Sequence, residues 1–475
     1  MMICTKLFSA LAILLIASLA RAATYAPCPD SDALPILKGS VCTTVIMPLS
    51  YADLAMAPAT EIRLFVRQFP AKGPSKGTVW LVAGGPGESG ASLYPMLDVL
   101  RSSFPDFDLM IPDHRGTGYS SRLCPREESV DSPGGAALAG AEWGSCPAHL
   151  AEHPERAGNF SMTTAAYDLK NLISTSNLDK PVYVYGVSYG TQLVLRTLQL
   201  GKTPITGVIL DSLVPLQTAA QWDLSHRSHA VDDVGRTVLA GCDKDTVCHR
   251  MMGQKAETVY RRVLAMMREQ PILLAKIPGK DLKRFLGSML DVPEARSRIP
   301  YLIKDLQLAR GQELETVLQT LQDAGKQFGE FPQSPPSIPL VSIISASENN
   351  LRPNLTADDL KKEDETLLFA SRLPELLVQP LFPSYPRDEY FGKVPTQFPP
   401  VLVFAGMLDP KTPYDGALSH IAALKKFSKV GLVSLPSAPH FILWSAPACF
   451  TRYARNFVQG GTLADHHCGV SKRRP

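Results

Sequence analysis

Strand-like and helix-like runs alternate along the first half of this chain, and that alternation limits the possible folds more than any other feature. Near-continuous apolar runs stand at residues 78–85, 107–113, 181–187 and 205–213. Such runs are typical of strands that are covered on both faces. Two segments between them, 162–177 and 189–200, carry apolar side chains at helical spacing. The pattern predicts an α/β fold with a mostly parallel, doubly wound sheet.

The alternation stops near residue 216 and resumes near residue 396. Helical segments fill the interval, and prolines crowd at 331–339 and 380–386. Two further strand-like runs follow, at 400–406 and 430–436. We therefore expect a core built from 23–215 and 396–475, with a helical lid over 216–395.

Residues 1–22 have the composition of an export signal. One lysine precedes an apolar run of about fourteen residues, and Ala20-Arg21-Ala22 fits the small-x-small rule for signal peptidase. An uncleaved membrane anchor is the alternative, but the run is short of the ~20 residues needed to cross a bilayer. We expect an exported protein, periplasmic or extracellular, without stable membrane insertion.

The cysteines fit an oxidising compartment. Eight remain after the signal, at positions 28, 42, 124, 146, 242, 248, 449 and 468. Sequence alone cannot choose among the 105 pairings of eight cysteines. Closeness along the chain nevertheless favours 28–42, 124–146, 242–248 and 449–468. Zinc is the alternative, but no CxxC pair or HExxH helix is present, so we expect no metal.

The charge balance gives no sign of a nucleic-acid partner. The chain has 48 basic and 45 acidic residues, a formal net charge of +3, and no long run of one sign. The sequence leaves the oligomeric state open.

Gly186-x-Ser188-x-Gly190 stands where the strand-like run 181–187 meets the helix-like run 189–200. A nucleophile elbow requires this placement, because the tight turn exposes the serine and the glycines leave room for it. Ser188 is therefore the candidate nucleophile. The alternative is a serine in an ordinary turn.

A serine nucleophile needs a base and a carboxylate that orients the base, and in this architecture both follow it in the chain. Asp409 and His440 each come just after a strand-like run. We assign Asp409 as the orienting acid and His440 as the base. The other later histidines, at 420, 466 and 467, are expected to be surface residues.

Acyl transfer also needs donors for the oxyanion. One is the N–H of Tyr189, and the other is expected in the glycine-rich loop that begins at Gly84 and Gly85. A phosphate-binding loop is excluded, because no Gly-Lys-Ser/Thr follows.

Four motifs together resemble the proline iminopeptidase and tripeptidyl aminopeptidase family of α/β-hydrolases: GGPG after a strand, DHRGTGYS from Asp113, GVSYG and GMLDPKTP. The cysteine-rich C-terminal segment and the phrase MLDVPEARSRIPYLIKDLQ resemble the secreted tripeptidyl aminopeptidase branch. The resemblance implies Ser188 as nucleophile, Asp409 as acid, His440 as base, and the GGPG glycines with Tyr189 as the oxyanion hole. Asp113 and Arg115 are shared with the family, and we expect them to brace the edge of the sheet.

Two positions depart from the family pattern. Phe441 follows His440 where the family usually has glycine, and Ala346 replaces a cysteine in the segment ISASENN, although Glu348 is retained. The family implies lid glutamates that bind a substrate ammonium, so Glu348 is the candidate for this role. The alternative is an exposed charge at a helix end.

These inferences predict a serine exopeptidase that acts on peptides with a free N-terminus and needs no cofactor. Two alternatives stay open: a carboxylesterase or lipase that uses the same triad, and a non-catalytic binding protein with the same fold. Sequence alone does not say whether one residue, a proline or a tripeptide is released.

Overall fold

The computed structural model describes residues 24–52, 60–176, 179–269 and 274–469. The predicted export signal lies outside these ranges. None of the described helices is both long and apolar enough to cross a membrane.

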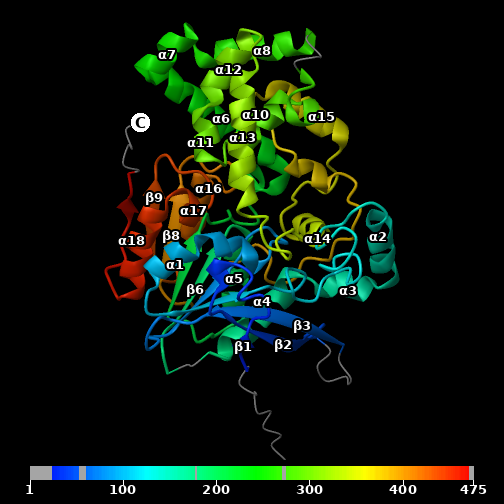
Figure 1. The fold of residues 1–475 in the computed structure, drawn as a ribbon, viewed down its shortest axis with the longest axis vertical. Coiled ribbons are helices and arrows are strands. Elements are labelled where there is room, and N and C mark those ends of the chain that lie inside the picture. Colours follow the sequence, from blue (N-terminus) through cyan, green and yellow to red (C-terminus); the bar gives the residue numbers. More distant parts are fainter. Residues whose placement is uncertain (1–23, 53–59, 177–178, 270–273, 470–475) are drawn as a thin grey trace, which may run out of the picture.

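A single sheet of ten strands forms the base of the molecule (Figure 1), in the order β1-β2-β3-β5-β4-β6-β7-β8-β9-β10. The antiparallel edge contains β1 (Ala26–Pro27), β2 (Val41–Pro48) and β3 (Glu61–Phe69), and β3 pairs antiparallel with β5. The parallel strands are β4 (Thr78–Val82), β5 (Asp108–Pro112), β6 (Val182–Val187), β7 (Gly207–Asp211), β8 (Val401–Gly406), β9 (Val430–Leu435) and β10 (His466–His467). The predicted fold class is confirmed.

Alternate residues of the parallel strands enter two different cores, which explains their almost entirely apolar sequences. In β4, Trp80 and Val82 pack into one core, whereas Val79 and Leu81 pack into the other. The first core is covered by α4 (Met162–Ser174), α5 (Tyr189–Gln199) and α16 (Tyr414–Leu424). The second is covered by α1 (Leu97–Ser103), α17 (Ile442–Ser445) and α18 (Pro447–Val458).

Helices make up the chain between β7 and β8, where the described residues include no strand. We call this region the cap, and it lies on one side of the sheet (Figure 1). Its helices are α6 (Arg227–Lys244), α7 (Thr246–Met252), α8 (Ala256–Glu269), α10 (Leu282–Met289), α11 (Pro293–Ser297), α12 (Ile299–Gln307), α13 (Gln312–Lys326), α14 (Ile338–Glu348) and α15 (Ala357–Thr366). Most of them share a third hydrophobic core of their own.

Helix α14 differs from the other cap helices because its apolar residues join the core of the sheet. Leu340, Ile343 and Ile344 pack there, and all are almost completely buried. The end of α14, and with it Glu348, is therefore held against the sheet and not at the outer surface of the cap.

Asp113 and Arg115 are structural, as expected. Oδ1 of Asp113 accepts the N–H of Gly90 at 2.7 Å, and its Oδ2 accepts the N–H of Tyr119 at 2.8 Å. Arg115 donates to both carboxylate oxygens of Asp168 at 2.6 and 2.7 Å. These bonds fasten the loop after β5 to α4 and to the glycine-rich loop.

The eight described cysteines form the four disulfides that their closeness in sequence favoured: 28–42, 124–146, 242–248 and 449–468. Three of them staple parts of the sheet-bearing core, and Cys242–Cys248 joins α6 to α7 in the cap.

Candidate active site

Ser188 occupies a strained turn between β6 and α5. Its backbone has φ 54° and ψ −124°, in the positive-φ region that serine rarely adopts. A Cβ on Gly186 would lie 2.5 Å from the carbonyl oxygen of Gly190, and a Cβ on Gly190 would lie 2.6 Å from that of Ala83. Only glycine fits at either position. The turn leaves Ser188 partly exposed at the floor of a cavity of about 710 Å³.

Asp409 and His440 are hydrogen-bonded to each other just beyond β8 and β9. Nδ1 of His440 lies 2.8 Å from Oδ2 of Asp409. The N–H groups of Lys411 and Thr412 each donate to Oδ1 of Asp409 at 2.7 Å, and the Thr412 hydroxyl donates to Oδ2 at 2.6 Å. Burial opposes ionisation of Asp409, but His440 and the Thr412 donors outweigh it and lower the pKa of this carboxyl. An ionised Asp409 fixes the His440 ring with Nδ1 protonated and Nε2 available as a base.

His440 and Ser188 line the same cavity. The loop after His440 is held by Asp211 at the end of β7, whose two carboxylate oxygens accept the N–H groups of Ile442 and Leu443 at 2.8 Å each. The carbonyl of Asp211 also accepts the N–H of Ser188 at 3.0 Å. One residue therefore positions both the nucleophile turn and the histidine loop.

The predicted oxyanion-hole residues lie next to Ser188 or line the same cavity. A Cβ on Gly84 would lie 3.2 Å from the Cβ of Ser188, and both Gly85 and Tyr189 line the cavity. Tyr189 is the first residue of α5, so its N–H has no partner within the helix. No hydrogen bond within the described ranges uses the N–H of Gly85. Both donors are free to receive a charged oxygen.

Glu348 lies in the cavity wall, only 2 % exposed, and is not a surface charge. Its Oε2 accepts from Arg196 at 3.2 Å and Gln217 at 2.6 Å, and its Oε1 accepts from the Tyr385 hydroxyl at 3.0 Å. A carboxylate has about four acceptor sites, so one remains on Oε1.

Glu88 is a cavity carboxylate to which the sequence analysis gave no role. It follows the GGPG turn, and its Oε2 would lie 3.4 Å from a Cβ on Gly84, the residue that also contacts Ser188. No described residue donates a hydrogen bond to it. Burial raises the pKa of Glu88, and Lys411 and His440 counteract this effect only in part. Its position directly after the turn was the available signal, but the sequence could not show that the carboxylate faces the cavity.

The prediction for His420 was wrong. It was predicted to be a surface residue, but it is 6 % exposed, because α16 packs against the sheet. Its Nδ1 lies 2.8 Å from the carbonyl oxygen of Val214, and burial lowers its pKa to about 4.

Comparison with known proteins agrees with the fold of the chain. The family model of the alpha/beta hydrolase fold matches residues 77–250, which contain β4 to β7 and the Ser188 turn. The chain has the α/β-hydrolase fold. YuaR of Escherichia coli (strain K12) is 25% identical over 223 residues, which cover 44% of this chain and 43% of YuaR.

Solved structures are similar at a coarser level. An epoxide hydrolase from an endophytic Streptomyces has a TM-score of 0.40 at 18% identity, covering 91% of this chain and 100% of that one. A bromoperoxidase from Bacillus anthracis has a TM-score of 0.35 at 13% identity, covering 88% and 100%. Likenesses at this level say nothing about the substrate of this chain.

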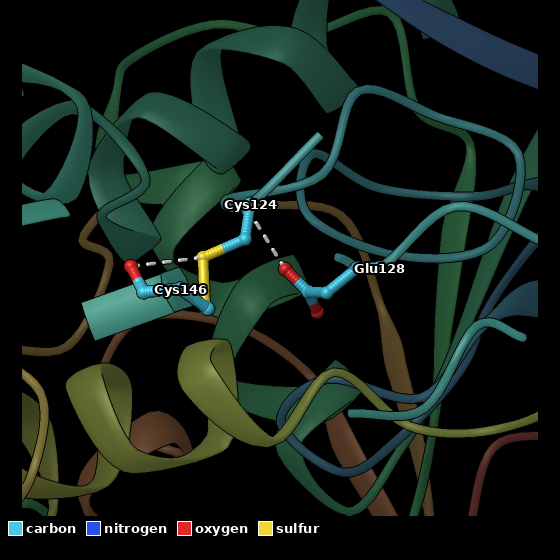
Figure 2. A group of neighbouring side chains, drawn as sticks. All are labelled: Cys124, Glu128 and Cys146. Atoms are coloured by element: carbon cyan, nitrogen blue, oxygen red, sulfur yellow. Dashed lines mark hydrogen bonds between the residues drawn. A yellow bond between two sulfur atoms is a disulfide. The ribbon is translucent and has the colours of Figure 1, made fainter. Parts of the chain in front are cut away.

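The described residues contain one geometric candidate for a metal site, the buried group Cys124, Glu128 and Cys146 (Figure 2). Its two sulfurs are joined in a disulfide, so neither is a thiolate. Oε2 of Glu128 accepts the N–H of Cys124 at 3.0 Å, and its Oε1 accepts the Ser337 hydroxyl at 2.5 Å. The cluster is therefore a structural link between the segment after β5 and α14.

Proposed function

We propose that this α/β-hydrolase is a serine exopeptidase that cleaves short peptides from a free N-terminus. The proposal rests mainly on one observation: a single cavity is lined by the strained Ser188 turn, by His440 with its hydrogen bond to Asp409, and by two residues with free N–H donors. The resemblance to the proline iminopeptidase and tripeptidyl aminopeptidase family supports the choice of peptide bonds.

In the proposed reaction, Oγ of Ser188 attacks the peptide carbonyl while its proton passes to Nε2 of His440. The N–H groups of Gly85 and Tyr189 stabilise the resulting oxyanion. When the C–N bond breaks, His440 returns the proton to the leaving amine, and the acyl group remains as an ester of Ser188. His440 then takes a proton from water as the water attacks this ester. It passes that proton to Oγ of Ser188 when the ester bond breaks, and the N-terminal fragment leaves.

The charge of the cavity supports an amine-bearing substrate. Its lining includes four carboxylates, Glu88, Asp223, Asp291 and Glu348, but only two permanent cations, Arg227 and Lys411. A substrate ammonium would offset this excess. Glu88 is the carboxylate best suited to receive it, since no described residue already hydrogen-bonds to it, and Glu348 offers one further acceptor site.

The volume supports a small substrate. A cavity of about 710 Å³ falls within the ~300–1,000 Å³ typical of small-molecule sites. Its apolar part, which includes Trp222, Phe328 and Trp444, would pack against the substrate side chains. We further propose export, which the four disulfides support because such bonds persist in oxidising compartments.

The test is hydrolysis of arylamides of proline, alanine and alanine-alanine-proline, each with a free and with an acetylated N-terminus. We expect at least a tenfold preference in kcat/KM for the free amine, as a lost charge-assisted hydrogen bond would give. Indifference to acetylation would overturn the exopeptidase proposal. Turnover of nitrophenyl esters without turnover of any arylamide would favour the esterase alternative.

A fluorophosphonate probe tests the non-catalytic alternative. We expect it to label the wild-type protein and not Ser188→Ala. The matched control is Ser92→Ala, which removes another hydroxyl from the same cavity lining and should still be labelled. Absence of labelling in both proteins would favour a binding module.

A further inference from the structure

A second cavity of about 370 Å³ adjoins the active site between the cap and the loop after Asp409. We call it the side cavity. Its walls come from α6, α10, residues 278–279, residues 370–373 and residues 410–411. It shares Arg227, Asp291, Leu373 and Lys411 with the main cavity. These shared residues form the boundary between the two cavities.

The side cavity has the opposite charge to the main one. Four cations line it, Arg227, Arg284, Arg372 and Lys411, against one carboxylate, Asp291. Two of these cations are already paired. Arg284 lies 3.0 Å from Asp364 and 2.6 Å from Glu375, and Lys411 lies 3.1 Å from Asp291.

Arg227 and Arg372 are different. Within the ranges that the structure describes, neither guanidinium has an ion pair or a hydrogen bond. Arg227 lines both cavities, and the guanidinium of Arg372 lies over Gly279, where a Cβ would be 1.7 Å from its Nη2. A side chain at residue 279 would displace this group, whereas glycine leaves it room.

The surroundings of Arg227 make an anionic ligand favourable. Burial lowers the pKa of Arg227, because its charge has lost contact with water. The negative charges of Asp409, Asp291 and Asp223 raise this pKa again, but only in part. None of the three lies within ion-pair distance, and Asp409 and Asp223 are engaged by other donors. A carboxylate that binds through both oxygens would supply the hydrogen bonds and the negative charge that the guanidinium lacks.

We propose that the side cavity is a carboxylate subsite in which Arg227 and Arg372 bind a carboxylate of the substrate. This inference rests on the proposed peptidase function and narrows it. Free carboxylate acceptor sites line the main cavity, and two guanidinium groups without partners among the described residues line the side cavity. The preferred substrate is therefore a short peptide that carries both an ammonium and a carboxylate. The carboxylate is either the C-terminus of the peptide or an acidic side chain.

Binding to the Ser188→Ala protein separates the two sources without hydrolysis. Calorimetry would compare Ala-Ala-Ala-Ala, the same peptide as its C-terminal amide, and the amide of Ala-Ala-Glu-Ala. We expect at least one carboxylate-bearing peptide to bind about tenfold more tightly than the carboxylate-free amide. Preference for the first identifies the C-terminus, and preference for the third identifies an acidic side chain.

Arg227→Gln and Arg372→Gln, each added to Ser188→Ala, should reduce this preference to less than threefold. Arg372 is exposed, so its replacement should fold normally even if that of Arg227 does not. The control is Arg310→Gln, which removes an exposed cap arginine that lines neither cavity and should leave the preference unchanged. The proposal is overturned if the parent protein shows no preference, or if the preference survives both arginine replacements.

The experiments distinguish failure of the subsite proposal from failure of the peptidase proposal. If the wild-type protein cleaves no arylamide but the carboxylate preference disappears with Arg372→Gln, the subsite stands and the reaction assignment fails. If arylamides are cleaved and all three peptides bind equally, the reaction stands and the subsite fails.

Discussion

The sheet-bearing core and the cap place their polar groups in different ways. In the core, each reactive residue follows the end of a strand, and its position is fixed by local backbone geometry: Ser188 after β6, Asp409 after β8 and His440 after β9. In the cap, polar groups are fixed by partners from distant segments, as Glu348 is by Arg196, Gln217 and Tyr385. Under the proposed function, the core supplies the chemistry, and the boundary with the cap supplies the charges that select the substrate.

The largest expected effect comes from a substitution that disables the core site and leaves the cap unchanged. Asp409→Asn should lower kcat by about 10⁴-fold, because an amide no longer favours the His440 tautomer with Nε2 free. Steady-state kinetics on the best arylamide would measure it, with unfolding curves to confirm that the protein is folded. The matched control is Asp415→Asn, an exposed carboxylate in the first turn of α16, which should change kcat less than twofold. Retention of more than a tenth of the activity in Asp409→Asn would exclude its role in the triad.

Replacing each of the two glutamates that line the cavity shows how much each one contributes to stability at the boundary between the core and the cap. Glu348→Gln removes the buried partner of Arg196, and both side chains are 2 % exposed. Arg196 keeps its ion pair with Asp388 at 3.3 Å. We therefore expect a loss of about 2 kcal/mol of unfolding free energy, less than the ~3–5 kcal/mol of a buried charge left without any partner. Glu88→Gln has no hydrogen bond to lose, so chemical denaturation should show no comparable loss.

The effect of Glu88→Gln on the melting temperature should depend on pH in a direction that the pKa shift of Glu88 fixes. The pKa of Glu88 is raised from 4.5 by burial, so the folded protein holds this proton more tightly than the unfolded chain. Ionisation therefore lowers stability as the pH rises through the folded-state pKa, and below about 4.5 the penalty disappears. We expect Glu88→Gln to melt about 1–2 °C above the wild type at neutral pH and at the same temperature near pH 4. A neutral-pH melting temperature below the wild type would contradict a desolvated carboxylate without a hydrogen-bond donor in the described part of the chain.

Removing one disulfide from each region would compare the stability that the disulfides give to the core and to the cap. Cys124–Cys146 closes a separation of 22 residues beside the core, whereas Cys242–Cys248 closes 6 residues in the cap. By loop entropy, replacing both cysteines with alanine should cost about 3 kcal/mol for the first pair and about 2 kcal/mol for the second. Urea denaturation followed by fluorescence would measure both. An equal or larger loss in the cap variant would mean that native contacts, and not loop length, dominate.

The sequence predicts the core well because strand burial, the elbow glycines and the order of Ser188, Asp409 and His440 are all readable from neighbouring residues. The cap is less readable. The roles proposed for Arg227 and Arg372 in the cap, and for Glu88 at its boundary in the core, depend on which cavity each side chain faces. This orientation depends on contacts between segments that are far apart in the chain. His420 was misassigned for the same reason, since its partner is the carbonyl of Val214.

The smallest expected effect concerns Phe441, where core and cap meet. Its φ of 61° lies in the left-handed region, and its ring lies 6.3 Å from that of Phe328 in the cap. This conformation would also suit glycine, the residue usual at this place in the family that the sequence resembles. It costs a non-glycine residue about 1 kcal/mol, so Phe441→Gly should be about 1 kcal/mol more stable than Phe441→Ala.

The same pair of variants tests what the ring does for the substrate. Both remove it from the cavity lining, so both should raise kcat/KM for arylamides with bulky residues about threefold relative to alanine arylamide, by opening space beside His440. Denaturation gives the strain from the difference between Gly and Ala, and kinetics gives the steric effect from the difference between Ala and Phe. If glycine is no more stable than alanine, the turn relaxes without strain, and the retention of phenylalanine must be explained by its contact with the cap alone.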